Sequence, residues 1–569
     1  MNSPFPHEDT LRSTASNIPD SFGQNLFTAD PYSKALLRAY LPPDLYSHLL
    51  PHFEALGQEA GERLDALARS ADQNAPVLSV RNRGGEDESR VVKHPDYIEL
   101  ERAAYSRYGL AAMSHRPGVL GWHDTMPPVA KYALSHLFVQ AEFGLCCPVS
   151  MTDSLARTLR RFGSKDLVDK VLPQVAALDF DTLRQGAMFM TEQAAGSDVS
   201  ATQTVAEEQR DGRWRLYGDK WFCSNPDAGF AMVLARSDKR EGLAGVSLFL
   251  LPRDLPDGSH NRYRILRLKD KLGTRSMASG EIRLEGAHAW LIGERGRGFQ
   301  QMADMVNNSR LSNGMRAAGL MRRALTEALY VARNRRAFGR SLVDMPLMQR
   351  QLVKMMVPTE QARSVMYQTA MALGRADSGD AQAKTLVRIL TPLIKFRACR
   401  DARKVTGDAM EVRGGCGYIE EWVEPRLMRD AHLGSIWEGT SNIVALDVLR
   451  AIRKNQCLDA LRAHVAQLLG EGAACPNALA EAQAAALAQA WSLAAEAAPD
   501  ENSPFARQAA SALYNVVSLA ALRSEARHPG LESRNQLADL VLIHRLAVRN
   551  PCAAPLPQPD YGTLLAHAG

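Results

Sequence analysis

The sequence predicts an α+β protein, mostly α-helical, in which a β-rich middle region separates two helical regions. Apolar residues recur at helical spacing from about residue 46 to 180 and again from about 300 to 454. Between about 185 and 295 the chain instead shows short β-branched or alternating segments bounded by Gly, Pro and Asp. Because strands and helices do not alternate along the chain, a doubly wound sheet is not expected.

At 569 residues the chain is too long for a single hydrophobic core, so several domains are expected. The first residues are rich in Pro, Ser and Asn without periodicity, and they predict an extended arm. An Ala-rich helical segment follows the second helical region. The expected organisation is an N-terminal arm, a helical domain, a middle β domain that forms a small barrel or a sandwich, a second helical domain and an additional helical domain, over residues 1–45, 46–182, 183–295, 296–454 and 455–569.

Composition and cysteine content indicate a cytoplasmic globular protein. The chain is 46% hydrophobic and 23% charged, and its net charge of +5 is small for its length. Eight cysteines include no C-x-x-C pair, which favours reduced thiols over a disulfide framework or a zinc site, and no metal site is expected. The N-terminus lacks the pattern of a signal peptide, and no apolar run approaches the ~18 residues of a membrane span.

The most informative carboxylate is Glu438, which is followed by Gly439 and a run of small polar residues. Apolar residues then recur at helical spacing, so a helix is expected to start near Thr440–Asn442. A carboxylate just outside a helix N-terminus can act as a base while neighbouring amides hold a cofactor. The alternative is an acidic residue that complements the helix dipole, and this segment alone does not decide between them.

Two further segments have the composition of a cofactor site. In Met188–Asp198, Gly196 permits a close approach of the backbone, and Thr191 and Ser197 supply hydroxyl groups. In Gly218–Asn225, aromatic residues and a hydroxyl share one strand, which suits a planar heterocycle. An ordinary surface turn and core aromatics of a barrel are the respective alternatives. The glycines of 293–298 follow no βαβ pattern, so we expect a domain-boundary turn there.

In their order along the chain, these segments resemble the acyl-CoA dehydrogenase flavoprotein family. The resemblance runs from about residue 150 to 454. The AidB branch of the family, which is tied to DNA alkylation, is resembled in three features: the N-terminal arm, the motif I-W-E-G-T and the C-terminal extension. It rests on the motifs M-T-E-x-x-x-G-S-D, G-x-K-x-x-x-S-N, K-x-G-x-R-S, R-x-x-F-G, G-G-x-G-Y and W-E-G-T. The family fold consists of an N-terminal helical domain, a middle β-barrel and a C-terminal four-helix bundle.

The resemblance implies an FAD-dependent acyl-CoA dehydrogenase. Glu438 matches the base that removes the α-proton of an acyl-CoA thioester while a β-hydride passes to flavin N5, and Arg310 matches an arginine held close to that base. Trp437, Gly439 and Ser197 are expected near the substrate. The cofactor-binding positions implied by the motifs are Met188, Met190, Thr191, Ser197, Phe222, Ser224, Arg335, Phe338, Glu411, Gly415, Thr440 and Asn442.

The resemblance also implies partners. Arg335 and Phe338 match residues that reach the FAD of a neighbouring subunit, so a homotetramer built as two dimers is expected, with an electron-transferring flavoprotein as the acceptor. In this family the developing enolate is stabilised by donors aimed at the thioester carbonyl, which include the backbone N–H of the base. Desolvation under the substrate is expected to raise the proton affinity of the Glu438 carboxylate by more than the helix N-terminus lowers it. The carboxylate is then a base usable near neutral pH.

The chain departs from the family pattern at three positions. Pro346 stands where a glutamine often meets the adenine, and Glu411 replaces another familiar glutamine. Trp437 replaces the usual Tyr before the base, which reshapes the acyl pocket. We expect FAD binding to survive these changes, whereas the length of the acyl chain cannot be inferred.

The alternative function is a DNA-protecting flavoprotein with weak or vestigial dehydrogenase activity. Residues 310–454 carry 25 Lys and Arg against 14 Asp and Glu, but residues beyond 454 carry 7 against 10. A DNA-binding appendage should be basic, so the mildly acidic last domain argues against this function. The candidate DNA-binding residues are Arg450, Arg453 and Lys454, with Arg397, Arg400, Arg403 and Lys404 beside them.

Overall fold

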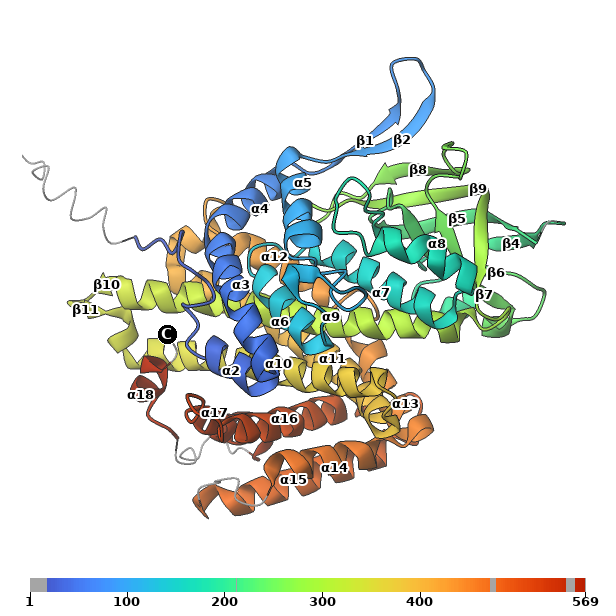
Figure 1. Ribbon diagram of the computed structural model, residues 1–569. Helices are drawn as coiled ribbons and strands as arrows, with labels where there is room; N and C mark the ends of the chain where they lie inside the picture. Colours follow the sequence, from blue (N-terminus) through green and yellow to red (C-terminus); the bar gives the residue numbers. More distant parts are fainter. Residues whose placement is uncertain (1–17, 211, 471–476, 549–557, 568–569) are drawn as a thin grey trace, which may run out of the picture. The chain divides into compact units, whose positions relative to one another are not determined.

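The computed structural model describes residues 18–210, 212–470, 477–548 and 558–567 (Figure 1). The chain forms two compact units. The barrel unit comprises Leu64–Asn313 together with Ile436–Ile443. The bundle unit comprises the chain up to Arg63, Gly314–Ser435 and the chain from Val444 onward. The segment around Glu438 therefore belongs to the same unit as the β-domain, although about 140 residues separate them in sequence.

The barrel unit begins with the helices that the sequence predicts. Pro residues stand at the first turns of α5 and α6, where a missing N–H leaves no hydrogen bond unmade. Ser164 caps α8 through a bond from Leu167 N to its hydroxyl. The helical elements are α4 (Arg63–Gln73), α5 (Pro95–Glu101), η1 (Arg102–Arg107), η2 (Val119–Gly121), α6 (Pro128–Phe138), α7 (Cys146–Phe162) and α8 (Lys165–Val175).

A β-hairpin interrupts this helical region, where the sequence analysis expected only helices. Strands β1 (Val77–Arg81) and β2 (Asp87–Val92) pair antiparallel. Gly85 closes the turn between them with a left-handed φ of 84°, which glycine adopts without strain. The hairpin packs beside strand β8 (Tyr263–Leu268) of the β-domain, and these tertiary contacts outweigh the helical context of the surrounding sequence.

The middle domain is a β-barrel, as predicted. Strands β4, β5, β9, β7 and β6 pair in a closed ring, because β6 bonds to both β4 and β7. Strand β3 adds to β6 in parallel, and β8 adds to β9. The strands are β3 (Gly186–Phe189), β4 (Val205–Glu208), β5 (Trp214–Ser224), β6 (Phe230–Arg236), β7 (Val246–Pro252), β8 and β9 (Ser279–Ile292), with short turns η3 (Val199–Ala201) and η4 (Gly242–Gly245).

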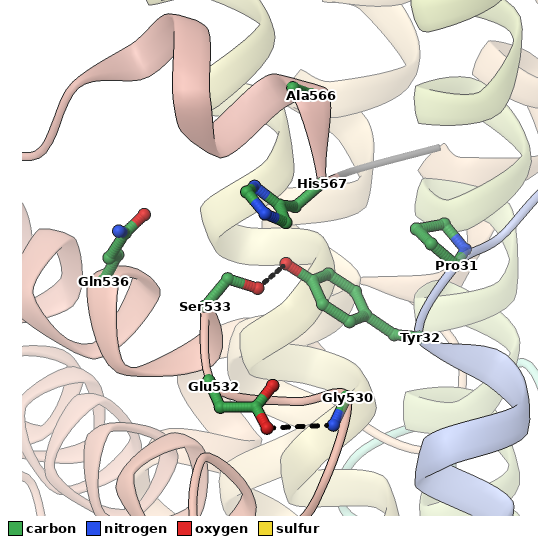
Figure 2. Close-up of a pocket in the computed structure, with 8 residues that line it drawn as sticks. All are labelled: Pro31, Tyr32, Gly530, Glu532, Ser533, Gln536, Ala566 and His567. Atoms are coloured by element: carbon green, nitrogen blue, oxygen red, sulfur yellow. Dashed lines mark hydrogen bonds between the residues drawn. The ribbon is translucent and has the colours of Figure 1, made fainter.

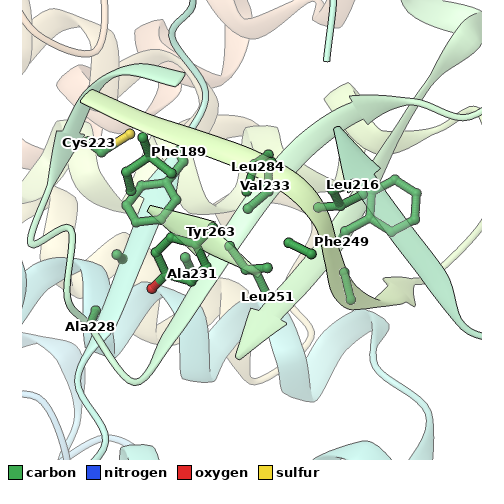
Figure 3. Close-up of a cluster of buried hydrophobic side chains, with 14 of the residues drawn as sticks. Phe189, Leu216, Cys223, Ala228, Ala231, Val233, Phe249, Leu251, Tyr263 and Leu284 are labelled. Carbon is green, nitrogen blue, oxygen red and sulfur yellow. The ribbon is translucent and has the colours of Figure 1, made fainter. Parts of the chain in front are cut away.

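The core of the barrel consists of inward-facing side chains from nearly every strand (Figure 3). Phe189, Val233, Phe249 and Ile282 are at most 1% exposed. Burial of each such side chain contributes roughly 1.5–3 kcal/mol. The barrel is therefore a rigid support for the loops and strand faces that carry the predicted cofactor residues.

In the bundle unit, the expected extended arm is partly helical. Residues 1–17 lie outside the described residues, but α2 (Ser33–Tyr40) and α3 (Pro43–Gly61) begin within the segment that we expected to be extended. Leu36 and Leu37 of α2 are buried. A helix of eight residues is not stable alone, so tertiary packing rather than local periodicity selects it.

Long helices form the rest of the bundle unit. Helix α9 (Gly298–Asn334) contributes residues to both units, α10 and α11 pack along each other, and α12 packs on α11. A two-residue strand pair, β10–β11, links α9 to α10. The elements are β10 (Arg336–Ala337), β11 (Arg340–Ser341), η5 (Leu342–Asp344), α10 (Pro346–Asp377), α11 (Ala381–Arg413), η6 (Gly414–Tyr418), α12 (Glu424–Gly434) and α13 (Ser441–Asn455).

The C-terminal extension is helical, as predicted, and packs on α10 and α11. Buried ion pairs reinforce this contact: Arg534 binds Glu360 of α10 and Glu525 of α16, each at 2.6 Å. The extension comprises α14 (Cys457–Leu469), α15 (Asn477–Ala497), α16 (Ala506–Glu525), α17 (Arg534–Val541), η7 (Leu542–Leu546) and α18 (Tyr561–Ala566). Among the residues described, no helix combines the length and apolarity that a membrane span requires.

Candidate functional site

Glu438 lies on the turn directly before α13, so the predicted helix start at Thr440–Asn442 is confirmed. Its φ is 49°, in the left-handed region, and Gly439 follows with a φ of 102°. A non-glycine residue in this region carries backbone strain of about 1–3 kcal/mol, and such strain concentrates at functional sites. The conformation is unusual for glutamate and marks this turn as a candidate site.

Two consecutive residues of α9 hold this turn. Ser309 donates a hydrogen bond from Oγ to Glu438 Oε1 at 2.7 Å, and Arg310 donates from Nε to the main-chain carbonyl of Glu438 at 3.0 Å. The other carboxylate oxygen, Oε2, is buried and has no hydrogen-bond partner among the residues described. The structure thus brings the two predicted catalytic residues together, and it adds Ser309, which the sequence analysis did not identify.

A buried polar network fixes the helix turn that carries Ser309. Asn308 donates to Asp153 at 2.8 Å and to Ser154 at 2.7 Å, and it accepts from Tyr132 at 2.9 Å. Burial alone would raise the pKa of Asp153, but Lys131, at 2.7 Å, and His115 hold it well below its usual range. Asp153 is therefore ionised, and its charge is matched inside the unit.

Trp437 precedes the base and lies beside an aromatic ring of the N-terminal helical region. Its ring is 6.2 Å from that of Phe143, centroid to centroid, with 19° between the ring planes. Phe143 is buried. The two rings form an apolar wall next to Glu438, at the position where the sequence analysis expected Trp437 to reshape an acyl pocket.

The predicted flavin-edge residues lie at the end of β3 and in the loop after it. Met188 belongs to β3, and Met190 and Thr191 follow the strand. Trp221 N of β5 donates to Thr191 O at 2.8 Å, so this loop is bonded to the strand that carries Phe222 and Ser224. These residues therefore lie on adjoining segments of the barrel.

Phe222 and Ser224 have the exposure that a ligand-facing strand requires. Phe222 is 55% exposed, although the residues beside it in sequence are largely covered. Ser224 Oγ lies 3.5 Å from Ser279 Oγ. Lys269 Nζ lies 3.3 Å from the centroid of the Trp221 ring and 4.8 Å from that of Phe222. An exposed aromatic side chain beside a hydroxyl is suited to a planar heterocycle.

A buried ion pair explains why these two segments lie together. Glu192 of the M-T-E motif and Lys220 of the G-x-K motif pair at 2.6 Å, and the Lys220 side chain is fully buried. Burial alone would raise the pKa of Glu192, but Lys220 and hydrogen bonds from Thr204 and Gln203 lower it below the usual value. Burial lowers the pKa of Lys220, which the facing carboxylate opposes.

The sequence analysis did not single out this pair. A signal was present, because each charged residue stands inside a motif whose neighbours are apolar or aromatic, but sequence spacing does not reveal which charges face each other. Lys220 also donates to Leu234 O of β6 at 2.7 Å. The pair thus joins the loop after β3 to β5 and β6.

Thr440 and Asn442 flank the N-terminus of α13, and both are exposed. Their side chains are therefore available to a ligand beside Gly439. Ser197 lies in the loop after β3 and is also exposed. The structure places these residues in the barrel unit together with Glu438 and the flavin-edge strand.

The other predicted cofactor residues belong to the bundle unit. Arg335 donates to the carbonyl of Arg413 at 2.9 Å, next to the turn η6 that contains Gly415, and Glu411 accepts from Gln351 at 3.3 Å. Phe338 is 94% exposed and has a φ of 52° on the β10–β11 connection. These residues gather near the junction of α9, α10 and the end of α11.

The candidate DNA-binding residues lie near the end of α13. Arg453 binds Glu501 at 2.7 Å and the carbonyl of Ala498 at 3.3 Å. Arg450 lies 3.8 Å from Asp447 and is half-exposed. Two of the three cations thus have contacts within their own unit, and Lys454 is exposed.

A pocket of about 550 Å³ lies in the bundle unit (Figure 2). Tyr32 and Ser533 meet in it through a 2.7 Å hydrogen bond between their hydroxyls. Its lining residues are Pro31, Tyr32, Gly530, Glu532, Ser533, Gln536, Ala566 and His567. None of the predicted site residues lines this pocket, so it is not the site that the motifs indicate.

Comparison with known proteins agrees with these features. Residues 17–182 match the adaptive response protein AidB N-terminal domain, residues 187–287 the acyl-CoA dehydrogenase middle domain, and residues 296–453 the acyl-CoA dehydrogenase C-terminal domain. AidB of Escherichia coli K12 is 35% identical over 413 residues, which cover 70% of this chain and 73% of that protein.

Solved structures share the fold. Caenorhabditis elegans ACDH-11 in complex with C11-CoA superposes with a TM-score of 0.85 and 28% identity over 95% of this chain and 93% of that one. An acyl-CoA dehydrogenase from Bacillus anthracis complexed with FAD superposes with a TM-score of 0.64 and 20% identity, over 89% and 87% of the two chains.

Proposed function

Because the chain belongs to the acyl-CoA dehydrogenase family of oxidoreductases, we propose that Glu438 is the base that removes the α-proton of an acyl-CoA thioester. The proton would go to Oε2, and the β-hydrogen would leave as hydride to a bound FAD. In this proposal Arg310 holds the main chain of the base, and Ser197, Trp437 and Gly439 face the substrate.

The state of the Glu438 carboxylate carries the proposal. One oxygen is fixed by Ser309, and the other is buried without a hydrogen-bond partner from the described part of the chain. A buried acceptor without a donor costs about 1–3 kcal/mol, so its presence calls for an explanation. Because Oε2 accepts no hydrogen bond from the described residues, its lone pairs are available to a proton from the α-carbon.

The residues of the barrel unit fit an FAD isoalloxazine. Phe222 offers an exposed ring, Thr191 and Ser224 supply hydroxyls, and Met188 and Met190 lie on the adjoining segment. FAD, when bound, accepts the hydride. Thr440 and Asn442 would contact its diphosphate and adenosine, since exposed polar side chains at a helix N-terminus favour an anionic group.

Residues of the bundle unit extend the proposal to an oligomer. Phe338, at 94% exposure, is a large apolar side chain that its own chain leaves in solvent, and Arg335 lies at the start of the same connection. We assign both to contacts with the FAD of a second subunit in a homotetramer, and Glu411 and Gly415 to FAD binding. Light scattering of the purified protein tests this assembly, and a monomer mass would contradict it.

The electron acceptor and the location of the protein follow from the same proposal. A reduced flavin must be reoxidised before the next turnover, and an electron-transferring flavoprotein in the cytoplasm would serve as the acceptor. Reoxidation of substrate-reduced protein by such a flavoprotein, compared with reoxidation by O₂, tests this part. Faster reoxidation by O₂ would instead indicate an oxidase.

The test of the activity is an anaerobic spectral screen of the purified protein against saturated CoA thioesters of increasing chain length. An eleven-carbon thioester belongs in the panel because the related C. elegans structure contains C11-CoA. We expect at least one thioester to bleach the flavin absorbance on the order of seconds or faster, which is the turnover time of a typical enzyme. Free CoA is the control, and dithionite shows that the flavin is reducible. No bleaching by any thioester would reject the proposal.

Binding of DNA by Arg450, Arg453 and Lys454 is the weaker proposal. Arg453 is engaged by Glu501 and by a main-chain carbonyl, which leaves fewer cations for phosphate contacts. A gel-shift titration with duplex DNA at low salt tests it. Binding that weakens with salt and on Arg450→Ala would support DNA recognition, and a flat titration would reject it.

A further inference from the structure

Ser309 contacts the carboxylate of Glu438, and the proposed function gives it no part in the reaction beyond fixing one oxygen. Its side chain is 1% exposed, and its hydroxyl donates to Glu438 Oε1 at 2.7 Å. An ionised carboxylate offers only acceptors, so the serine must be the donor in this bond. Hydrogen bonds to a charged acceptor are about twice as strong as those between neutral groups.

The direction of the hydrogen bond from Ser309 to Glu438 is fixed, because neighbouring contacts hold the helix turn that carries Ser309. Asn308, the preceding residue, bonds to Asp153, Ser154 and Tyr132. Successive residues of a helix point about 100° apart. Fixing Asn308 against the N-terminal helical region therefore fixes the direction in which Ser309 presents its hydroxyl.

The next residue completes the clamp on the base. Arg310 binds the main-chain carbonyl of Glu438, while Ser309 binds its carboxylate. One turn of α9 thus holds both the carboxylate and the main-chain carbonyl of Glu438, and Oε2 accepts no hydrogen bond from the described residues. Because the φ of Glu438 is left-handed, the turn needs such external contacts to persist.

We propose that Ser309 is a positioning residue that orients Glu438 so that Oε2 faces the α-carbon of the thioester. The inference rests on the proposed function. In the reaction the α C–H bond would break, its electron pair would form the new C=C bond as the β-hydride leaves to a bound FAD, and the proton would form a bond to Oε2. Ser309 keeps its own proton throughout and donates to Oε1 before and after the transfer.

The hydroxyl also stabilises the ionised form of the base, because it donates to a charged oxygen. The charged group recorded directly against Glu438 is Arg310, and Lys131, His115 and Asp153 lie behind Asn308. A neutral hydroxyl changes none of those charges when it is removed. Its loss should therefore act on Glu438 alone.

The experiment is Ser309→Ala in the FAD-bound protein, followed by anaerobic stopped-flow bleaching across pH. We expect bleaching to slow about tenfold at neutral pH because the carboxylate is misoriented. We also expect the acidic limb of the pH profile to move up by about one pH unit, since a charge-assisted hydrogen bond is lost. Ser309→Thr retains the hydroxyl and should restore the midpoint.

The matched control is Ser364→Ala. Ser364 is also a fully buried serine that donates to a carboxylate, Glu525, at 2.8 Å, but it lies in the bundle unit. It should lower the melting temperature without moving the pH profile of bleaching. If Ser309→Ala does not fold, Ser309→Cys preserves the volume with a weaker donor and should move the midpoint in the same direction.

The two proposals fail in different ways. A wild-type flavin that no thioester bleaches rejects the proposed function. A Ser309→Ala or Ser309→Cys protein that bleaches with the wild-type pH midpoint and rate overturns the positioning role of Ser309, while leaving Glu438 as the base.

Discussion

Glu192 and Glu438 are carboxylates of the same unit, each inside a motif, but their surroundings differ. Glu192 accepts from Lys220, from the Thr204 hydroxyl and amide, and from the Gln203 amide, so both of its oxygens are satisfied. Glu438 has one hydrogen bond to Oε1 and none to Oε2 from the described residues. Glu192 links segments of the barrel through Lys220. Glu438 is fixed at Oε1, and its Oε2 accepts no hydrogen bond from the described residues.

The two carboxylates differ in how many donors they accept from, and this difference matches their proposed roles: Glu192 links strands, and Glu438 removes a proton. A fully satisfied buried ion pair resists change, because removing either partner strands the other charge. A buried oxygen without a donor costs stability, and at Glu438 the proposed proton transfer would give that oxygen a partner.

Glu438→Gln should lower the rate of flavin bleaching by acyl-CoA by about 10²–10⁴-fold, because a general base is lost. Bound FAD and the melting temperature should change little, since the amide keeps the shape of the side chain and can still accept from Ser309. Single-turnover stopped-flow spectroscopy measures the rate. Bleaching at the wild-type rate would remove Glu438 as the base.

Lys220→Met should destabilise the protein by about 3–5 kcal/mol, because it leaves the Glu192 charge buried and unpaired. Denaturant unfolding followed by tryptophan fluorescence measures the loss. The double variant Glu192→Leu with Lys220→Met should recover much of it, since no charge is then stranded. Equal destabilisation by the single and double variants would contradict the ion-pair account.

The stability difference between the wild-type protein and Glu192→Gln should depend on pH. The folded pKa of Glu192 is depressed below its ordinary value of 4.5, so its contribution is fully present above pH 4.5 and is lost as pH falls through the folded pKa. Melting curves between pH 7 and pH 3 measure this. A difference that grows on acidification would show that the sign of the shift is wrong.

Phe222→Ala should weaken FAD binding by roughly two- to tenfold, because an aromatic contact contributes about 0.5–1.5 kcal/mol. Fluorescence titration of the FAD-free protein measures the dissociation constant. Tyr217→Ala is the control, since Tyr217 is another exposed aromatic residue of β5. Equal effects of the two substitutions would mean that Phe222 has no special contact with the flavin.

Much of the fold was accessible from sequence because long periodic segments and motif order carry it. The strands of the middle domain, the long helices and the start of α13 followed from local patterns, whereas the choice of a barrel over a sandwich followed from the family resemblance. The β1–β2 hairpin and α2 did not, because both depend on packing partners distant in sequence. Weak local propensity cannot reveal such partners.

The candidate site was likewise predicted only in part from the sequence. Glu438 and Arg310 were recognisable from their motifs, and the structure brings them together. Ser309 and the Glu192–Lys220 pair were missed, because their importance lies in contacts across 129 and 28 residues of sequence. A single serine on a helix has no sequence signal that distinguishes a donor to a base from an ordinary helix residue.

The central claim is that the Glu438 oxygen not bound by Ser309 takes the α-proton. A crystal structure of the FAD-bound protein with a non-oxidisable acyl-CoA analogue tests it most directly. The account predicts that this oxygen lies about 3–3.5 Å from the α-carbon while Ser309 still bonds to the other oxygen. An α-carbon placed against the Ser309-bound oxygen, or far from Glu438 altogether, would contradict the account.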